Sequence, residues 1–332
     1  MNFGVDVQRS FDIRRNWRAT GGMRTAATDT LVLDQGESVI ALGAFASGQW
    51  SPVAPLTLST GGRFDRLTFG VSDNFLSDGV NNSANRDLSA ATFHTGASWV
   101  TGPRATWYAN VSTAFETPTT TELSALQDGA GGFNPDLDPQ RILTVEGGVR
   151  GDVGGRLRYT ATVFRTTYDD AIIQYLETTG RAFFRNAGQT RNTGLELGAH
   201  AALTSWLDAS VAWTESRYRF ARYRIPNKAV VDTLDGNQVA GVPDRFVRLG
   251  LRGRMKSFTL DADHTLSGEM FGDDRNTVRV ESWGKGALNV RLGWSGDVGA
   301  TRLAPFVAVN NVLNEAYVGS VTLNGANGRV LE

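Results

Sequence analysis

Apolar and polar residues alternate along many short stretches of this chain with a period of two. The stretch 157–163 is representative, because its odd positions are Leu, Tyr, Ala and Val and its even positions are Arg and Thr. Successive side chains of a β-strand face opposite sides of the sheet. The pattern therefore predicts strands with one apolar and one charged face. It recurs at 143–150, 247–252, 258–263 and 288–294.

Short and long connections alternate strictly between these stretches. Tight connections are predicted at 51–55, 100–104, 151–156, 203–206, 254–257 and 295–301. Long polar connections are predicted at about 20–36, 72–87, 116–139, 168–190, 219–243, 267–281 and 313–327. Outer-membrane β-barrels have short periplasmic turns and long extracellular loops. We therefore predict an all-β protein, an antiparallel up-and-down transmembrane β-barrel in the bacterial outer membrane.

About fourteen strands are expected, most of them longer than the five or six residues usual in globular sheets. They cover roughly 2–19, 36–50, 55–71, 87–100, 104–116, 139–151, 155–168, 190–203, 206–219, 243–254, 257–267, 281–295, 300–313 and 327–332. Tryptophans near the expected strand ends favour an interfacial aromatic girdle; they are Trp50, Trp99, Trp107, Trp206, Trp213, Trp283 and Trp294. A soluble sandwich with one solvent-exposed sheet face is the alternative that the alternation alone leaves open.

Composition narrows the function classes. Lysine and arginine number 33 and aspartate and glutamate 34, so no overall positive charge points to nucleic acid as a partner. The chain contains no cysteine, which excludes disulfides and thiolate chemistry. The chain contains no run of 18 apolar residues, so no transmembrane helix is predicted. The first fifteen residues lack the apolar region of a signal peptide, so we expect the chain to be part of a longer protein.

Two proline-containing boxes then point to a family. The segment Tyr108–Leu123, followed by Asn134–Gln140, resembles a signature of TonB-dependent outer-membrane receptors. The matching residues are Phe115, Pro118, Thr119, Glu122, Leu123, Asn134, Pro135, Leu137 and Pro139. Gln140 departs from the usual Glu of the family. Further similarity covers 184–188, 194–197 and 309–314. We expect the two boxes to have a structural role at the ends of an extracellular loop, because proline ends strand pairing.

The resemblance implies a 22-stranded barrel, embedded in outer-membrane lipid and closed by an N-terminal plug domain. Such receptors import a ferric siderophore or a similarly large nutrient with energy from the TonB complex, which acts through the plug. Residues 1–332 would then be a partial barrel domain, with the plug absent. The resemblance does not identify the ligand.

Cationic and aromatic residues of two long loops are the ligand-binding candidates. They are Tyr175, Arg181, Phe183 and Arg185 in one loop and Arg222, Tyr223 and Arg224 in the next. Arginine binds anionic chelates through charge-assisted hydrogen bonds, and aromatic rings add a flat contact surface. Solvated loop residues without a ligand are the alternative for all seven.

The sequence gives no indication of an enzyme or of a cofactor. It has no G-x-S-x-G, P-loop or H-E-x-x-H motif. The three histidines, His94, His200 and His264, fall on different expected strands, so no metal site is predicted. A passive porin or structural surface barrel remains the alternative function. An outer-membrane hydrolase with His94 as base is a more remote one.

Overall fold

The computed structural model describes residues 1–19, 21, 23–24, 30–102, 104–124, 126, 132–176, 182–186, 188–227 and 230–324. Within these residues one antiparallel sheet of 13 strands dominates the fold. Each strand pairs with the next long strand along the chain, so the topology is up-and-down. No helix in the described part of the chain is long and apolar enough to cross a lipid bilayer.

The sheet strands are β1 Asn2–Trp17, β2 Leu31–Val53, β3 Leu56–Asp73, β4 Ala84–Gly102, β5 Ala105–Glu116, β6 Gln140–Val153, β7 Leu157–Asp169, β10 Gln189–Ala202, β11 Leu207–Arg222, β14 Arg245–Met255, β15 Phe258–Ser267, β18 Ala287–Trp294 and β21 Phe306–Val309. They confirm thirteen of the expected strands, although β2 starts earlier than predicted and β18 and β21 are shorter. The expected strand at 327–332 lies outside the described residues.

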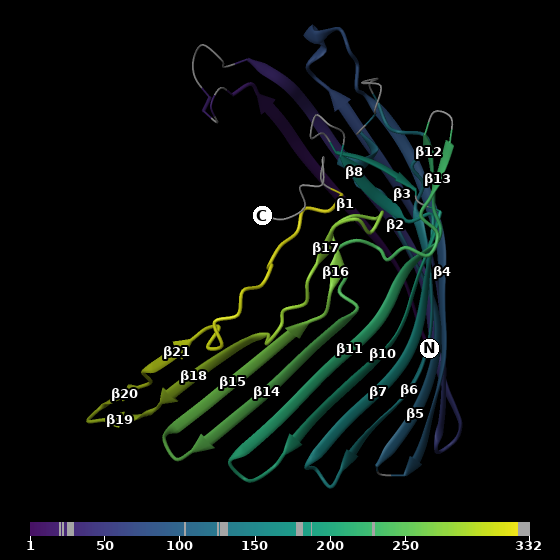
Figure 1. Cartoon of the computed structure of the whole chain (residues 1–332). Coiled ribbons are helices and arrows are strands. Elements are labelled where there is room, and N and C mark those ends of the chain that lie inside the picture. Colours follow the sequence, from purple (N-terminus) through teal and green to yellow (C-terminus); the bar gives the residue numbers. More distant parts are fainter. Residues whose placement is uncertain are drawn as a thin grey trace.

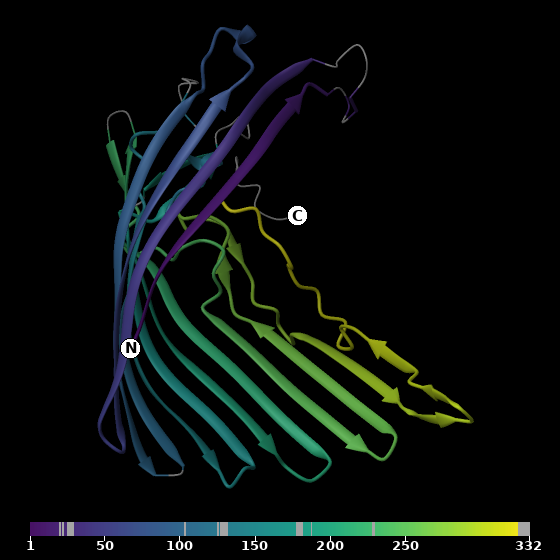
Figure 2. The same cartoon turned by 180° about the vertical axis from the view of Figure 1, so that it is seen from behind.

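The sheet curves into an open wall with β1 and β21 at its two edges, as Figures 1 and 2 show. Tight turns line one end of the wall, and the long connections gather at the other end (Figure 1). This is the arrangement that the alternating connections predict. With the long connections taken as extracellular, the concave face lines the lumen and the convex face contacts lipid.

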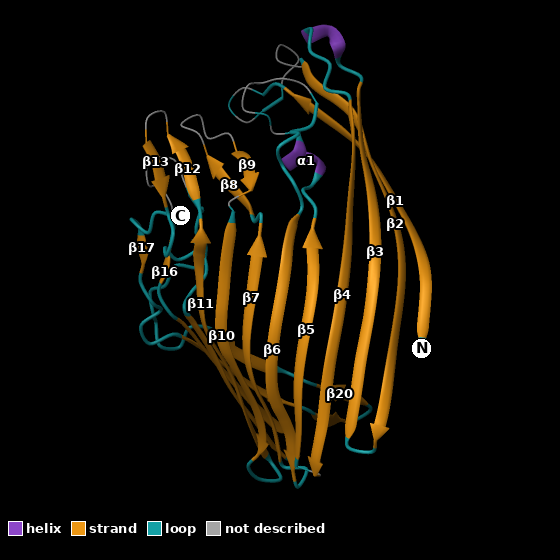
Figure 3. Cartoon of the chain, turned by 90° about the vertical axis from the view of Figure 1, so that its right-hand side faces the viewer, coloured by secondary structure: helices purple, strands orange, loops and turns teal. Residues whose placement is uncertain are grey.

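The long connections carry small elements that the alternation did not predict (Figure 3). They are the hairpins β8 Ile172–Leu176 with β9 Ala182–Asn186, β12 Arg224–Asn227 with β13 Val230–Thr233, and β16 Met270–Phe271 with β17 Arg279–Val280, together with the one-turn helices η1 Leu76–Asp78 and α1 Thr120–Leu123. A further hairpin, β19 Gly296–Val298 with β20 Thr301–Leu303, occupies the last tight connection.

Strand register sorts the side chains onto two faces, as the alternation predicts. On β7 and β10 the convex face carries Val163 opposite Leu195, and both side chains are exposed in the isolated chain. Five of the tryptophans lie beside the tight turns, where a girdle is expected: Trp50, Trp99, Trp107, Trp206 and Trp294. Trp213 instead lies in the middle of β11. Trp283 is in a long connection, where its ring stacks on Tyr317 at 4.3 Å.

Gly194 of β10 illustrates why several inward positions are glycine. A Cβ atom placed on Gly194 would lie 2.5 Å from the Glu215 carbonyl oxygen and 2.7 Å from the Phe164 ring. The ring of Phe164 therefore covers the glycine, and a larger residue would have to displace backbone or ring.

We expect Gly194→Ala to lower the free energy of unfolding by about 1–3 kcal/mol, the usual range for overpacking. Urea unfolding in lipid vesicles measures this change. Gly48→Ala is the matched control, because no atom lies within 4 Å of the Cβ that it adds. Equal unfolding midpoints for the two variants would show that the close approach at Gly194 has no energetic weight.

Candidate functional site

The first proline box leads directly from β5 into α1. Thr119 is the N-cap of this helix and forms a reciprocal capping box with Glu122. The Glu122 carboxylate accepts from the Thr119 N–H at 2.7 Å, and the Thr119 hydroxyl accepts from the Glu122 N–H at 3.3 Å. Such a box satisfies two otherwise unpaired donors at a helix start. Pro118, just before it, is fully buried.

Both boxes contribute a buried leucine to one apolar cluster. Leu123 of α1 and Leu137 of the second box each have 0% exposed side chain. They pack with Phe69 and Leu88, which face the lumen from the extracellular ends of β3 and β4. The boxes therefore fold back onto the inner wall of the barrel, and the loop between β5 and β6 is anchored to the sheet.

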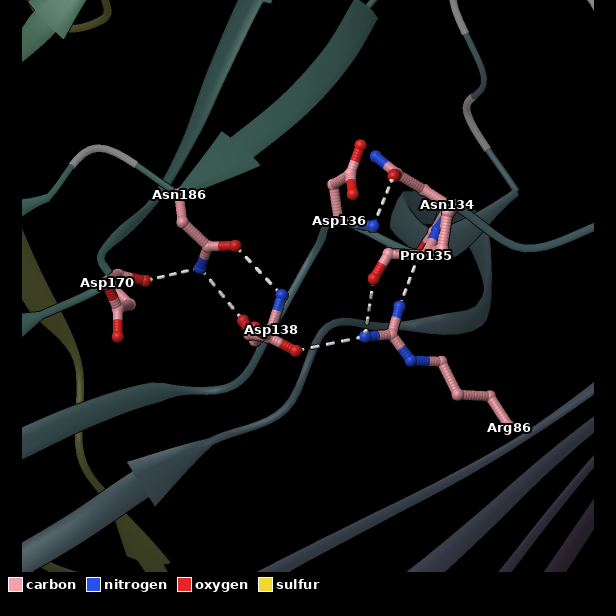
Figure 4. Close-up of polar contacts among 7 residues, drawn as sticks. All are labelled: Arg86, Asn134, Pro135, Asp136, Asp138, Asp170 and Asn186. Carbon is pink, nitrogen blue, oxygen red and sulfur yellow. Dashed lines mark hydrogen bonds and ion pairs between the residues drawn. The ribbon is translucent and has the colours of Figure 1, made fainter.

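Arg86 of β4 holds the second box from below, as Figure 4 shows. Its guanidinium donates to the carbonyl oxygens of Asn134 and Pro135 and to the Asp138 carboxylate, the last at 3.1 Å. Only 15% of the Arg86 side chain is exposed. The Asn134 side chain in turn accepts from the Asp136 N–H at 2.9 Å. One strand arginine thus fixes the backbone of the Asn-Pro turn.

Asn186 links the second box to the neighbouring loop (Figure 4). Its side-chain oxygen accepts from the Asp138 N–H at 2.8 Å. Its amide nitrogen donates to the carbonyl oxygens of Asp138 and Asp170. Asn186 ends β9, so the β5–β6 and β7–β10 connections are joined through this one amide.

The long connections pack together at the extracellular end of the sheet, and we call them the loop layer. A second apolar cluster extends this layer toward the C-terminal strands. Phe220, Tyr223 and Leu234 are buried together with Ala171. Arg185 of β9 lies against this cluster, because its Nη2 donates to the Tyr223 hydroxyl at 2.8 Å and its guanidinium lies 5.4 Å from the Tyr223 ring centre. Loops that are distant in sequence therefore meet at Arg185.

Asp274, between β16 and β17, is the most buried carboxylate of the layer, with 6% of the residue exposed. It accepts from the Ala240 N–H at 3.2 Å and from the Asn324 side-chain amide at 3.0 Å. Burial raises the pKa of Asp274, Asp273 beside it acts in the same direction, and the nearby Arg185 opposes the shift. We therefore expect the packing of the loops around Asp274 to depend on the protonation of this carboxyl.

This raised pKa predicts the sign of a pH effect. A carboxyl whose pKa is higher in the folded state contributes stability below its unfolded pKa, about 3.9, and loses that contribution as pH rises through the folded value. We expect hydrogen exchange in 235–240 and 272–278 to become faster, beyond the intrinsic pH effect, as pH rises above about 4. Asp274→Asn should abolish this excess, whereas Asp297→Asn, an exposed residue of the β19–β20 hairpin, should retain it. An unchanged excess in Asp274→Asn would contradict the assignment.

The loop candidates from the sequence differ in burial. Phe183 and Tyr223 are buried, with 2% and 3% exposed, and Arg185 is half-buried beside them. Arg222 and Arg224 are exposed at the end of β11 and the start of β12. The backbone of Tyr175 lies in β8 opposite Phe183. Arg181 lies outside the described residues. The structure thus brings Arg185 and Tyr223 together and leaves two arginines facing solvent.

A row of ion pairs on the lumenal face was not singled out from the sequence. Arg248 of β14 donates to Asp263 at 2.7 Å, and Arg252 donates to Asp261 at 2.5 Å, both on β15. Arg291 of β18 lies opposite Asp261 in the ladder. We call Arg248, Arg252, Asp261, Asp263 and Arg291 the lumenal ladder. Its charges were visible as the polar face of the alternation, but their pairing depends on strand register.

The lumenal ladder lines a hollow of about 500 Å³ on the concave face. The other polar residues of its lining are His200, Asp208, Ser210, Arg254, Asn289 and Asn310. No group of three or more histidine, aspartate or glutamate residues in the described chain is placed to hold a metal ion.

A family model for the β-barrel of TonB-dependent receptors matches residues 2–327. The chain belongs to this family. Its place is therefore the bacterial outer membrane, and the members of the family are receptors and transporters rather than enzymes. The ferrioxamine receptor of Yersinia enterocolitica is 26% identical over 170 residues, which are 50% of this chain and 22% of that protein.

Solved structures agree in fold. The unliganded ferric citrate transporter FecA superimposes with a TM-score of 0.75 at 17% identity, covering 99% of this chain and 49% of that one. The siderophore receptor PiuA from Acinetobacter baumannii gives a TM-score of 0.71 at 20% identity, covering 90% and 42%. The chain thus spans less than half the length of these two receptors and about a fifth of the ferrioxamine receptor.

Proposed function

We propose that this chain supplies wall strands and extracellular loops of a TonB-driven transporter for a ferric siderophore or a similarly large metal chelate. The observation that best supports this proposal is the extracellular loop layer. It is held over the lumen by Arg86, Asn186 and the buried leucines of both boxes. Ordered loops over the lumen present a pre-formed surface that can hold a large ligand before transport.

The exposed arginines are the residues that we assign to first contact with the chelate. Arg222 and Arg224 are exposed at the edge of the loop layer. Ferric complexes of carboxylate and catecholate siderophores are anionic, and a guanidinium binds carboxylate and similar oxygens through charge-assisted, often bidentate hydrogen bonds. Arg181 and Tyr175 complete this proposed contact set. Phe183, Arg185 and Tyr223 support it from within the layer.

Uptake of radiolabelled iron tests the proposal. A strain that lacks its own receptors is given the intact gene and is supplied in turn with ferrioxamine, ferric citrate and a ferric catecholate. We expect uptake of one chelate, saturable at low concentration and lost when TonB is deleted. Arg222→Ala combined with Arg224→Ala should weaken chelate binding at least tenfold. Uptake that does not saturate and persists without TonB would indicate a passive pore instead.

A further inference from the structure

The convex, lipid-facing side of β7, β10, β11 and β14 changes from apolar to basic at one level. Below that level the outward residues are apolar and exposed, including Val163, Leu195, Trp213 and Leu249. Above it, five outward positions on these strands are arginine: Arg165, Arg191, Arg217, Arg219 and Arg245. We call these five residues the arginine band.

Strand register shows that the band is contiguous. Arg165 lies opposite Thr193, which lies opposite Arg217. One row further toward the loops, Arg191 lies directly opposite Arg219. Neighbouring strands are about 4.8 Å apart, so the guanidinium groups can converge on one patch of surface.

The positive charge of the band is poorly compensated within the chain. Among the described residues of this surface, two acids accompany the five arginines: Glu215 lies 3.8 Å from Arg245, and Asp169 accepts a hydrogen bond from Gln189 at 2.8 Å. Arg219 donates to the Gly236 carbonyl oxygen at 2.7 Å, a neutral partner. The Nε atom of Arg191 is shielded from solvent and has no hydrogen-bond partner. Like charges directly opposite each other in a sheet are destabilising, so Arg191 and Arg219 favour a bound anion.

The height of the band matches the outer edge of the membrane. Arg165 is eight residues beyond the start of β7 at Leu157, next to a tight turn. Eight residues span about 26 Å of strand, or about 20 Å along the membrane normal at a tilt of about 40°. The apolar band of such barrels is about 25 Å tall. Arg165 therefore lies about 5 Å inside this edge, a distance that an arginine side chain spans to reach the headgroup region.

We propose that the arginine band binds the phosphate groups of an anionic lipid in the outer leaflet of the outer membrane. Basic clusters at the edge of a bilayer recognise anionic headgroups, and arginine contacts phosphate in a bidentate manner. The exposed apolar side chains below the band provide the adjoining surface for the acyl chains. The site is on the opposite face of the wall from the lumen, so it is separate from the proposed transport path.

Lipid retention by the protein extracted from outer membranes in detergent tests this site. Native mass spectrometry measures the binding of diphosphorylated lipid A to the protein. In the test variant Arg165, Arg191 and Arg217 are all changed to glutamine, and we expect at least tenfold weaker binding. The matched control changes Arg104, Arg156 and Arg302 to glutamine, three exposed arginines at the tight-turn edge. This control loses the same charge and should bind as the unaltered protein does.

Two additional probes separate a lipid headgroup from other sources of phosphate. Lipid A without its phosphates should bind at least tenfold more weakly to the unaltered protein, and inorganic phosphate at millimolar concentration should not displace lipid A. Far-ultraviolet circular dichroism establishes that both triple variants retain their strands. Equal lipid A binding by the test and control variants, or full displacement by inorganic phosphate, would overturn the proposal.

Discussion

Replacing Leu137 with alanine is expected to detach the β5–β6 loop from the barrel wall. The Leu137 side chain has no exposed surface and packs in one cluster with Leu123, Phe69 and Leu88. Truncation of a fully buried leucine costs about 2–5 kcal/mol, because it removes apolar contacts and leaves a cavity. The loss should be confined to the loop layer, since the strand ladders below it do not depend on this contact.

Hydrogen exchange and limited proteolysis of the loop residues measure the effect. Exchange in 118–124 and 132–139 should rise at least thirtyfold, which corresponds to about 2 kcal/mol. Leu143→Ala is the control, because Leu143 is on the lipid-facing side of β6 with 41% exposed and should leave loop exchange unchanged. If the two variants exchange alike, the boxes do not hold the loop, and a direct role in ligand contact becomes the better explanation.

The sheet could be predicted closely from the sequence because its information is local. Alternation with a period of two marks each strand, and the contrast of tight and long connections sets the antiparallel order. β7 and β10 lie within two residues of their expected ranges, at Leu157–Asp169 and Gln189–Ala202. β18 and β21 are shorter than expected, because the last tight connection forms the hairpin β19–β20 and residues 281–286 and 310–313 lie in connections.

The loop layer could be recognised only as a set of motifs, because its contacts link distant segments. Thr119 and Glu122 have the spacing of a capping box, so their local role was accessible. Arg86 was not, since a single arginine on a strand carries no signal for a carbonyl partner 48 residues away. Similarly, Arg185 and Tyr223 were chosen separately as ligand-binding candidates of two loops, and the sequence did not predict that the tertiary fold pairs them inside the layer.

This distinction divides the candidate residues into two functional classes. Arg185 is half-buried beside the 3%-exposed Tyr223, and we propose that it positions loops, whereas Arg222 and Arg224 face solvent and are the proposed ligand contacts. The same class of side chain, picked for the same chemical reason, thus has two different expected effects. Kinetic and structural measurements together can separate them.

Arg185→Ala is expected to loosen the loop layer and, through it, to reduce chelate uptake. The variant loses a 2.8 Å hydrogen bond and a cation–π contact to Tyr223, together worth about 2 kcal/mol. It also removes the positive charge that opposes the raised pKa of Asp274. Exchange in 171–174 and 233–240 should therefore rise about thirtyfold, and uptake should fall.

Arg222→Ala supplies the contrast that makes this prediction decisive. Its guanidinium faces solvent, so the variant should weaken chelate affinity while loop exchange stays as in the unaltered protein. Arg302→Ala, in the exposed hairpin at the opposite end of the barrel, controls for loss of one positive charge and should change neither property. A fall in affinity in Arg185→Ala without faster exchange would place Arg185 in direct contact with the chelate. Loss of a ligand contact alone does not change the rate of hydrogen exchange in the loops. The exchange rate of Arg185→Ala therefore decides whether Arg185 acts on the ligand or on the loops that surround it.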